Sequence, residues 1–299
     1  MSPTVVTRRR FLIGGAAVAS VALGITGYEY RRQLLDHGYT LVAEIEGDDL
    51  PPRTRGEVID GTFDSAFVDV PVGYSLAFPP DAVPGAPLPV SFCLPGRGGV
   101  ASWITDDPLF LADFLGQSVD GGGTRFALAA VDGGESYWHE RASGEDRMAM
   151  LMSEFLPLCA NRYKLGGEDS RSAIIGWSMG GYGALLAAES YPDRFAACAV
   201  VSPGLWTTYA EMAAGPGDAF DDRADFDAHD VFDGVDRIAD LPLLVQCGTA
   251  DPFYVACREF VGRLSDAARI EFSWGNHTPS YWRAMAPAQM RFLGSALAG

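Results

Sequence analysis

The chain has 299 residues, of which 48% are hydrophobic and 11% aromatic. That is enough for one packed α/β domain but too few for two large domains with linkers. Its formal net charge is -17, from 39 acidic and 22 basic residues. A surface this acidic repels phosphate backbones, which argues against nucleic acid as a partner and is compatible with a role in solubility alone.

The first 30 residues have the pattern of an export signal. Three arginines at 8–10 precede the uncharged apolar stretch 11–27, and this order of charged and apolar regions marks export. Residues 7–12 resemble the twin-arginine address. We predict that residues 1–30 direct the chain to the periplasm, cell envelope or outside of the cell. Both cleavage and retention as a membrane anchor are left open, and residues 31–60 are interpreted as a stem.

Residues 61–299 are predicted to form one catalytic domain, because apolar β-rich runs alternate with helix-compatible stretches. Residues 65–78 suggest an early antiparallel pair of strands. The later predicted strands are 88–96, 125–134, 171–178, 195–204, 241–249 and 269–275, and the predicted helices include 144–163, 181–191 and 254–268. Several strands are almost continuously apolar, as in parallel sheets buried on both faces. The expected fold class is α/β, an α/β-hydrolase fold with a mostly parallel central sheet between helices on both faces.

The five cysteines show no C-x-x-C pair, so a structural zinc site or a disulfide framework has little support. Most lie in apolar runs and are expected to be small buried side chains. One disulfide in an oxidising compartment is left open.

Ser178 stands among glycines at the junction of a strand-like and a helix-like run. Residues 176–180, Gly-Trp-Ser-Met-Gly, fit G-x-S-x-G, which is weak evidence alone in a chain with 35 glycines. The apolar run before it and the helix-forming residues after it supply the strand–turn–helix setting that the motif requires. We therefore predict that Ser178 is a nucleophile. The alternative is a glycine-rich turn with an incidental serine.

A serine hydroxyl needs a base to remove its proton. Of the four histidines, only His277 follows both Ser178 and a candidate acid on a late strand, the order expected in this fold. Asp251 directly follows a buried run and is expected to hold the imidazole in the activating tautomer. A surface-loop histidine and an Asp-Pro turn are the alternatives, and the aspartates between 218 and 240 are other candidate acids.

Acyl transfer also needs donors directed at the developing oxyanion. The backbone N–H of Met179, directly after the nucleophile, is the first candidate. The second is the N–H of Arg97, in the loop 94–99 that follows a predicted strand. A plain glycine-rich loop is the alternative for that segment.

With these residues assembled, the chain from about residue 61 onward resembles the putative esterase family, which includes esterase D and the antigen 85 mycolyltransferases. The resemblance rests on six motifs in order, "LPGRGG", "VDGGESYW", "GWSMGGYGAL", "YPDRFAACAVVSPGLW", "CGTADPF" and "GNHTPSYW". It implies a triad of Ser178, Asp251 and His277, with Met179 and Arg97 as oxyanion donors. Two departures are Pro95, where the family often has His or Asp, and an aspartate acid where the mycolyltransferases carry glutamate.

The substrate pocket is less defined by the sequence. Asp132, Tyr137, Trp138 and His139 follow a predicted strand and are expected at the mouth of the site, with buried aromatic packing as the alternative. Segment 204–234 is expected to cover part of the pocket and to influence acyl-chain preference.

The leading interpretation is an exported serine esterase without metal or cofactor that acts on a small-molecule or lipid ester. The first alternative is an acyltransferase with a sugar or lipid hydroxyl as acceptor, and the second is a non-catalytic cell-envelope protein on a hydrolase fold. Contact with a membrane is expected only through residues 1–30, and no oligomeric state is predicted. The sequence shows no metal-ligand spacing and no dinucleotide loop.

Overall fold

The computed structural model describes residues 50–83, 85–167, 171–215, 217–264 and 268–298. The predicted export segment and most of the predicted stem lie outside these residues. Within the described part of the chain, no helix combines the length and apolar character needed to cross a membrane.

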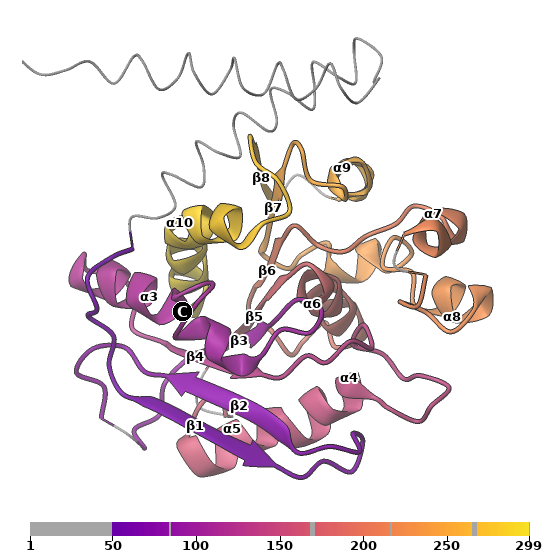
Figure 1. The fold of residues 1–299 in the computed structure, drawn as a ribbon. Coiled ribbons are helices and arrows are strands. Elements are labelled where there is room, and N and C mark those ends of the chain that lie inside the picture. Colours follow the sequence, from indigo (N-terminus) through magenta and orange to yellow (C-terminus); the bar gives the residue numbers. More distant parts are fainter. Residues whose placement is uncertain (1–49, 84, 168–170, 216, 265–267, 299) are drawn as a thin grey trace, which may run out of the picture.

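An eight-stranded sheet organises the described residues (Figure 1). Its spatial order is β1-β2-β4-β3-β5-β6-β7-β8. The first two strands run antiparallel to their neighbours, and all pairs from β4 to β8 are parallel. The mostly parallel α/β sheet predicted from the sequence is thus confirmed. The strands are β1 (Val58–Phe63), β2 (Val72–Ala77), β3 (Val90–Leu94), β4 (Ala127–Val131), β5 (Ser172–Trp177), β6 (Cys198–Val201), β7 (Leu243–Gly248) and β8 (Arg269–Ser273).

The early antiparallel pair differs from the prediction, which placed both strands within 65–78. Strand β1 covers 58–63 and pairs with β2, so that Val58 lies opposite Ala77 and Phe63 opposite Val72. Strand β1 was not predicted because Gly61 lies inside it, and glycine is uncommon in strands. In the structure the lack of a side chain at Gly61 accommodates the ring of Tyr74, with which any Cβ would collide. The first strand also starts three residues before the expected domain boundary, inside the segment interpreted as stem.

The predicted helices are present with adjusted ends. The run predicted at 144–163 consists of α4 (Arg147–Met150), a π-helical segment (Leu151–Phe155) and α5 (Leu156–Tyr163) in succession. The run predicted at 254–268 is α9 (Tyr254–Val261), which ends earlier than expected. The other helical elements are η1 (Ala101–Ile104), α3 (Leu111–Asp120), α6 (Met179–Ser190), α7 (Tyr209–Ala214), α8 (Arg223–Ala228), η3 (Val235–Ile238) and α10 (Pro279–Leu297).

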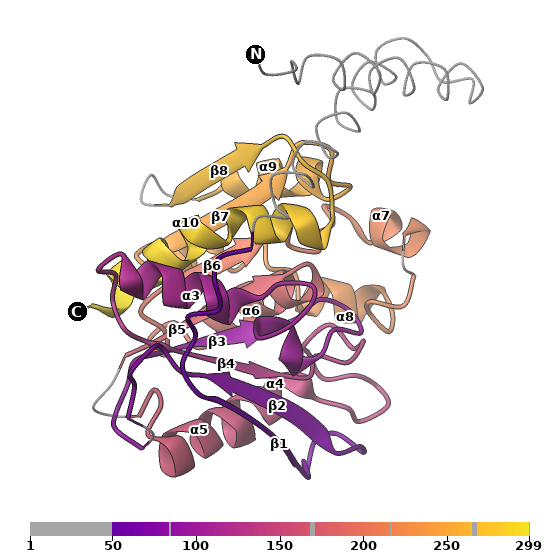
Figure 2. The same cartoon turned by 60° about the vertical axis from the view of Figure 1, so that its left-hand side comes forward.

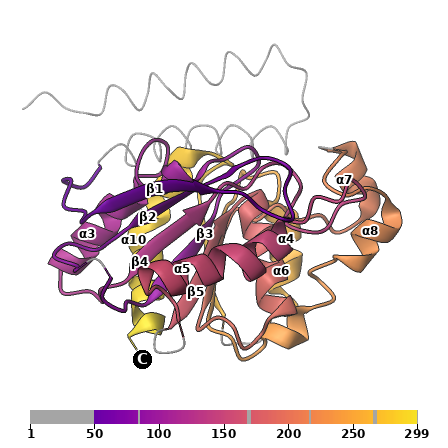
Figure 3. The same ribbon diagram turned by 90° about the horizontal axis from the view of Figure 1, so that it is seen from below.

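Helices cover both faces of the sheet. Helices α3 and α10 pack on one face (Figure 2) and α4, α5 and α6 on the other (Figure 3). Successive side chains of a strand point to opposite faces. In β4, Leu128 and Ala130 accordingly join the core under α3 and α10, whereas Ala129 and Val131 join the core under α5 and α6. This three-layer arrangement explains why the strands read as continuous apolar runs.

All five cysteines are buried and carry free thiols. They lie on β3, α5, β6, β7 and α9, where they fill small spaces against the sheet. Burial raises the pKa of the Cys93 and Cys198 thiols above its ordinary value. These thiols therefore remain protonated and act as small apolar side chains.

Glu189, near the end of α6, is a buried carboxyl group that is not among the predicted site residues. Its side chain is only 4% exposed, and its Oε1 has no hydrogen-bond partner within the described residues. Burial raises the pKa of Glu189 to about 9, and Asp230 and Asp233 add to the effect against the opposing influence of Arg237. The folded protein therefore carries this group in its neutral form at neutral pH.

We predict that Glu189→Gln stabilises the protein increasingly as pH rises. Because the folded-state pKa is raised, the unfolded chain loses this proton near pH 4.5 while the folded chain holds it to about pH 9. Stability should fall between these values by up to about 1.4 kcal/mol per pH unit from this group. The variant should lack that decline when unfolding by urea is measured across the range. Glu259→Gln, exposed on α9, is the matched control and should leave the pH dependence unchanged. Identical pH dependences for Glu189→Gln and the wild type would contradict the assignment.

Candidate active site

The carboxyl ends of neighbouring parallel strands bring the predicted site residues to one edge of the sheet. Ser178 follows β5, Asp251 follows β7 and His277 follows β8. These strands lie close together in the order β5-β6-β7-β8 and point the same way. Chemistry in open α/β sheets gathers at this edge.

Ser178 occupies a strained backbone conformation between β5 and α6. Its φ is 55° and its ψ is -120°, a region that residues with a side chain rarely adopt. Backbone hydrogen bonds hold it there: its N–H donates to the oxygen of Val201 at 3.0 Å, and its carbonyl accepts from the N–H groups of Gly181 and Gly204, both at 2.9 Å. The predicted strand–turn–helix setting is present.

Glycines make room for this turn on both sides. A side chain at Gly176 would collide with the backbone of Gly180, and one at Gly180 with the backbone oxygen of Leu94. A Cβ at Gly96 would lie 3.3 Å from the Cβ of Ser178. The G-x-S-x-G pattern therefore reflects close backbone approach, and it brings the 94–99 loop against the serine.

Ser178, His277 and Asp251 form a continuous hydrogen-bonded chain. Nε2 of His277 lies 2.8 Å from Oγ of Ser178, and Nδ1 lies 2.9 Å from Oδ2 of Asp251. An ionised carboxylate can only accept, so Nδ1 carries the proton and Nε2 accepts from the serine hydroxyl. The Asp251 side chain is completely buried, and its Oδ1 accepts from the N–H of Phe253 at 2.9 Å. Both oxygens of the carboxylate are thus fixed.

The segments after β7 and β8 hold each other in place. The N–H of Thr249 donates to the oxygen of Ser273 at 2.8 Å, and that of Ala250 to the oxygen of Gly275 at 2.9 Å. The ring of His277 contacts those of Phe253 and Trp282, each with its centroid 5.2 Å away and turned edge-on. These contacts restrict the ring to the orientation that joins the acid to the serine.

Sequence reasoning missed both aromatic neighbours of His277. The motifs "CGTADPF" and "GNHTPSYW" contained Phe253 and Trp282, but spacing alone does not say that two rings from separate segments contact a third. The signal available in the sequence was that Phe253 closely follows the predicted acid Asp251 and Trp282 closely follows the predicted base His277.

The two predicted oxyanion donors belong to segments that adjoin Ser178. Met179 begins α6, and Arg97 follows the glycine that approaches the serine. Neither backbone N–H donates to another described residue. The Arg97 guanidinium bridges Glu135 at 3.0 Å and Asp218 at 2.7 Å, and this contact lowers the pKa of Asp218. The side chain thereby ties the loop to the segment 217–222.

The four residues predicted at the mouth of the pocket have different surroundings. Asp132 accepts from the N–H groups of Gly73 at 3.0 Å and Ala101 at 2.8 Å, so its carboxylate joins neighbouring segments. Trp138 is completely buried and His139 is 1% exposed, which places both below the surface rather than at an open mouth. Tyr137 is 4% exposed and belongs to an aromatic group with Trp206, the ring centroids being 5.5 Å apart.

This architecture is the α/β-hydrolase fold, and the chain belongs to the family described as "Putative esterase", whose model matches residues 77–289. Family membership supports carboxylic ester hydrolase activity. No curated protein sequence gives a significant match.

Solved structures with this fold include a ferulic acid esterase, with a TM-score of 0.69 and 20% identity over 81% of this chain and 98% of that one. An S-formylglutathione hydrolase from Agrobacterium tumefaciens has a TM-score of 0.64 and 17% identity over 82% and 99%. MPT51 (FbpC1) of Mycobacterium tuberculosis has a TM-score of 0.60 and 19% identity over 81% and 99%. At these identities the similarity establishes the fold.

We predict that Ser178→Gly is more stable than Ser178→Ala by about 1 kcal/mol. Glycine relieves the positive φ at this position, which outweighs its greater freedom in the unfolded chain. Urea unfolding of the two variants measures the difference. The same pair of substitutions at Ser295, exposed on α10, is the control and should give the opposite order, because glycine destabilises a helix. If Ser178→Ala is the more stable variant, the turn is not strained.

Proposed function

We propose that the chain is a serine esterase that hydrolyses carboxylic esters through an acyl-enzyme on Ser178. The observation that carries the proposal is the hydrogen-bonded chain from Asp251 Oδ2 through His277 to Ser178 Oγ, with contacts of 2.9 and 2.8 Å. It occurs in a member of an esterase family, at the edge of the sheet where such chemistry gathers.

In the first half-reaction, Ser178 Oγ attacks the ester carbonyl while His277 Nε2 takes the hydroxyl proton. Asp251 stabilises the resulting imidazolium through Nδ1. The negative charge on the former carbonyl oxygen is stabilised by the N–H groups of Met179 and Arg97. His277 then donates its proton to the leaving alcohol oxygen as the carbon–oxygen bond breaks.

In the second half-reaction, water attacks the acyl-enzyme and His277 again acts as base and then as acid. The acid product leaves and Ser178 regains its proton. All proton transfers use His277, so the mechanism needs no cofactor.

An aromatic group beside His277 supports a substrate with an apolar acyl part. Trp206 lies edge-on to Phe253 at 5.3 Å, and Phe253 in turn contacts His277. Trp206 and Phe220 come from segment 204–234. We propose that this segment contributes to acyl-chain preference and that the substrate is a small-molecule or lipid ester.

Export is part of the proposal and rests on the arginines at 8–10 and the apolar stretch 11–27. Fusing residues 1–49 to a reporter that works only after twin-arginine transport tests it. Growth that depends on the reporter should disappear when Arg8 and Arg9 are changed to lysine. Unchanged reporter export in that variant would contradict the twin-arginine assignment.

We predict that Ser178→Ala and Asp251→Asn each lower kcat/KM on p-nitrophenyl esters by at least about 1000-fold, because each interrupts the proton relay. Initial rates of the full chain over a series of acyl lengths measure the effect. Ser295→Ala and Asp240→Asn are matched controls at exposed positions and should retain wild-type rates.

Substantial turnover by Ser178→Ala would contradict the assigned nucleophile. If the wild type releases acyl groups only when a sugar or lipid hydroxyl is added, the same acyl-enzyme serves transfer rather than hydrolysis, and the hydrolase proposal fails.

A further inference from the structure

Tyr137 is the one buried tyrosine among the described residues whose hydroxyl makes no hydrogen bond to another of them. Four tyrosines are buried in this part of the chain. The other three hydroxyls have partners: that of Tyr74 lies 2.7 Å from the hydroxyl of Tyr163, that of Tyr182 donates to the backbone oxygen of His229 at 2.9 Å, and that of Tyr281 lies 3.0 Å from Oγ of Ser273. A buried tyrosine hydroxyl normally has such a partner, so the exception indicates a place where a ligand supplies it.

The hydroxyl of Tyr137 borders open space, although the residue as a whole is only 4% exposed. It is not one of the fully enclosed polar atoms of the described residues that lack a partner, so the oxygen itself is accessible. Burial of the side chain raises the pKa of Tyr137 to about 12, and the nearby Arg97 opposes this effect. The hydroxyl therefore keeps its proton and offers a hydrogen-bond donor to a ligand.

The ring of Tyr137 forms part of an aromatic wall. Its centroid lies 5.5 Å from that of Trp206, 6.1 Å from that of Tyr182 and 6.3 Å from that of Phe220. An apolar group that packs on these rings would come within reach of a single polar donor. Such a donor in an apolar wall fixes the orientation of a ligand and selects among similar ligands.

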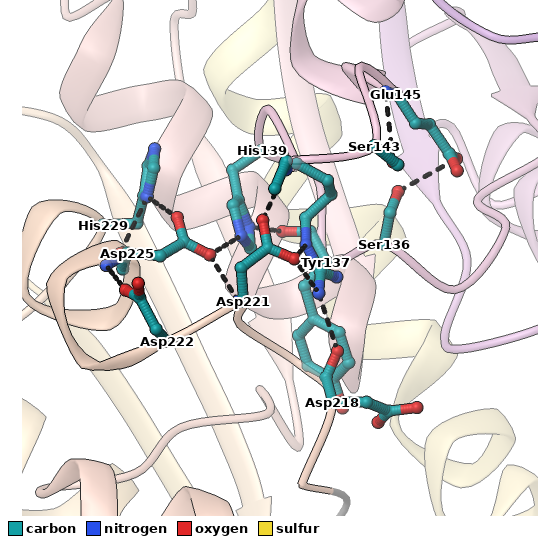
Figure 4. Close-up of polar contacts among 12 residues, drawn as sticks. Ser136, Tyr137, His139, Ser143, Glu145, Asp218, Asp221, Asp222, Asp225 and His229 are labelled. Atoms are coloured by element: carbon teal, nitrogen blue, oxygen red, sulfur yellow. Dashed lines mark hydrogen bonds and ion pairs between the residues drawn. The ribbon is translucent and has the colours of Figure 1, made fainter.

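The charged groups near Tyr137 are bound to each other. The guanidinium of Arg97 donates to both carboxylate oxygens of Asp218, at 2.8 and 2.7 Å, and Figure 4 shows Asp218 beside the ring of Tyr137. With its charge paired in this way, Arg97 does not favour an anionic ligand. The net charge of -17 disfavours one further. A neutral oxygen is therefore the acceptor that suits the Tyr137 hydroxyl.

The backbone at Tyr137 has a conformation that residues with a side chain rarely adopt. The φ angles of Tyr137 and Trp138 are 57° and 58°. Trp138 packs against Gly183, where any Cβ would collide with its ring. The carbonyl of Tyr137 accepts from Nδ1 of His139 at 3.0 Å, and Nε2 of His139 contacts Asp225 of α8 at 3.1 Å (Figure 4). Strain maintained by packing in this way concentrates at ligand-binding sites.

Tyr137 lies toward the acyl side of the proposed reaction. In that mechanism the leaving oxygen faces His277, which protonates it, and Tyr137 is not one of the two rings that contact His277. It contacts Tyr182, which follows Ser178 by one turn of α6. It also lies near Arg97, whose N–H is a proposed oxyanion donor. The Tyr137 hydroxyl therefore faces the acyl group rather than the alcohol.

We propose that the hydroxyl of Tyr137 donates a hydrogen bond to a neutral oxygen in the acyl group of the substrate. The site then selects acyl groups that carry an ether, hydroxyl or keto oxygen in addition to the ester carbonyl. The inference rests on the proposed ester hydrolysis at Ser178 and names its substrate class. An all-carbon acyl group would cover the hydroxyl without bonding it, and a covered, unbonded donor weakens binding.

The test uses p-nitrophenyl esters in matched pairs, in which one acyl methylene at successive positions is replaced by an ether oxygen. Tyr137→Phe should lower kcat/KM by about tenfold for at least one oxygen-containing ester and by less than about twofold for its all-carbon match. Each ester is compared between enzymes, so its intrinsic reactivity cancels. Tyr191→Phe, at a position 41% exposed, is the matched control and should change neither rate.

The Tm tests whether the hydroxyl is free in the unliganded protein. Tyr137→Phe should have the Tm of the wild type, because no internal hydrogen bond is lost. Tyr182→Phe should have a lower Tm, because it loses the bond to the backbone oxygen of His229. A fall in Tm for Tyr137→Phe as large as that for Tyr182→Phe would show that the hydroxyl is already bonded, and would overturn the proposal.

The proposal is also overturned if folded Tyr137→Phe hydrolyses both members of every pair as the wild type does, an outcome that leaves the esterase function intact. If the wild type hydrolyses no ester, the proposed function fails, and isothermal titration calorimetry of the same esters with Ser178→Ala decides this inference. Adding Tyr137→Phe to Ser178→Ala should then weaken binding of the oxygen-containing ester alone. Equal weakening for both esters, no weakening, or no binding at all would overturn it.

Discussion

The turn between β5 and α6 is the constraint on which the candidate site depends. It holds Ser178 at a φ of 55°, a conformation maintained by the hydrogen bond that its N–H donates to Val201 of β6 and by those that its carbonyl accepts from Gly181 and Gly204, rather than favoured by the residue itself. The same turn brings the backbone of Leu94 and Gly96 against the start of α6. A single packing arrangement thus brings the hydroxyl to His277 and places the loop that carries Arg97 against the turn from which α6 and Met179 follow.

Parallel strands supply the second constraint. Because β5, β7 and β8 point the same way, the residues after them meet at one edge although they lie up to 99 positions apart in sequence. The completely buried Asp251 then has both oxygens fixed. The aromatic rings around His277 come from the loops that follow the same strands. The sheet therefore fixes the positions of the three site residues. Segment 204–234 adds the surface that we propose selects the acyl group.

Much of this arrangement was predictable because the apolar runs and the residues that directly follow them indicated the same fold and the same site. The apolar runs marked the parallel strands, and the position of Ser178, Asp251 and His277 after such runs predicted that they meet. Other features were not predictable from local pattern. Gly61 masked β1, so the antiparallel pair was misplaced. His139 is 86 residues from Asp225, and no spacing rule joins a histidine on one loop to a short helix so far along the chain. Burial of Trp138 likewise depends on packing against Gly183, which only the fold reveals.

The most direct test of the central claim is covalent labelling of the full chain with a fluorophosphonate, followed by intact mass spectrometry and peptide mapping. A serine activated through His277 and Asp251 should take one label per chain, on Ser178, and His277→Gln should slow the labelling strongly. Absence of label on the folded wild type, or a label on another residue, would contradict the account.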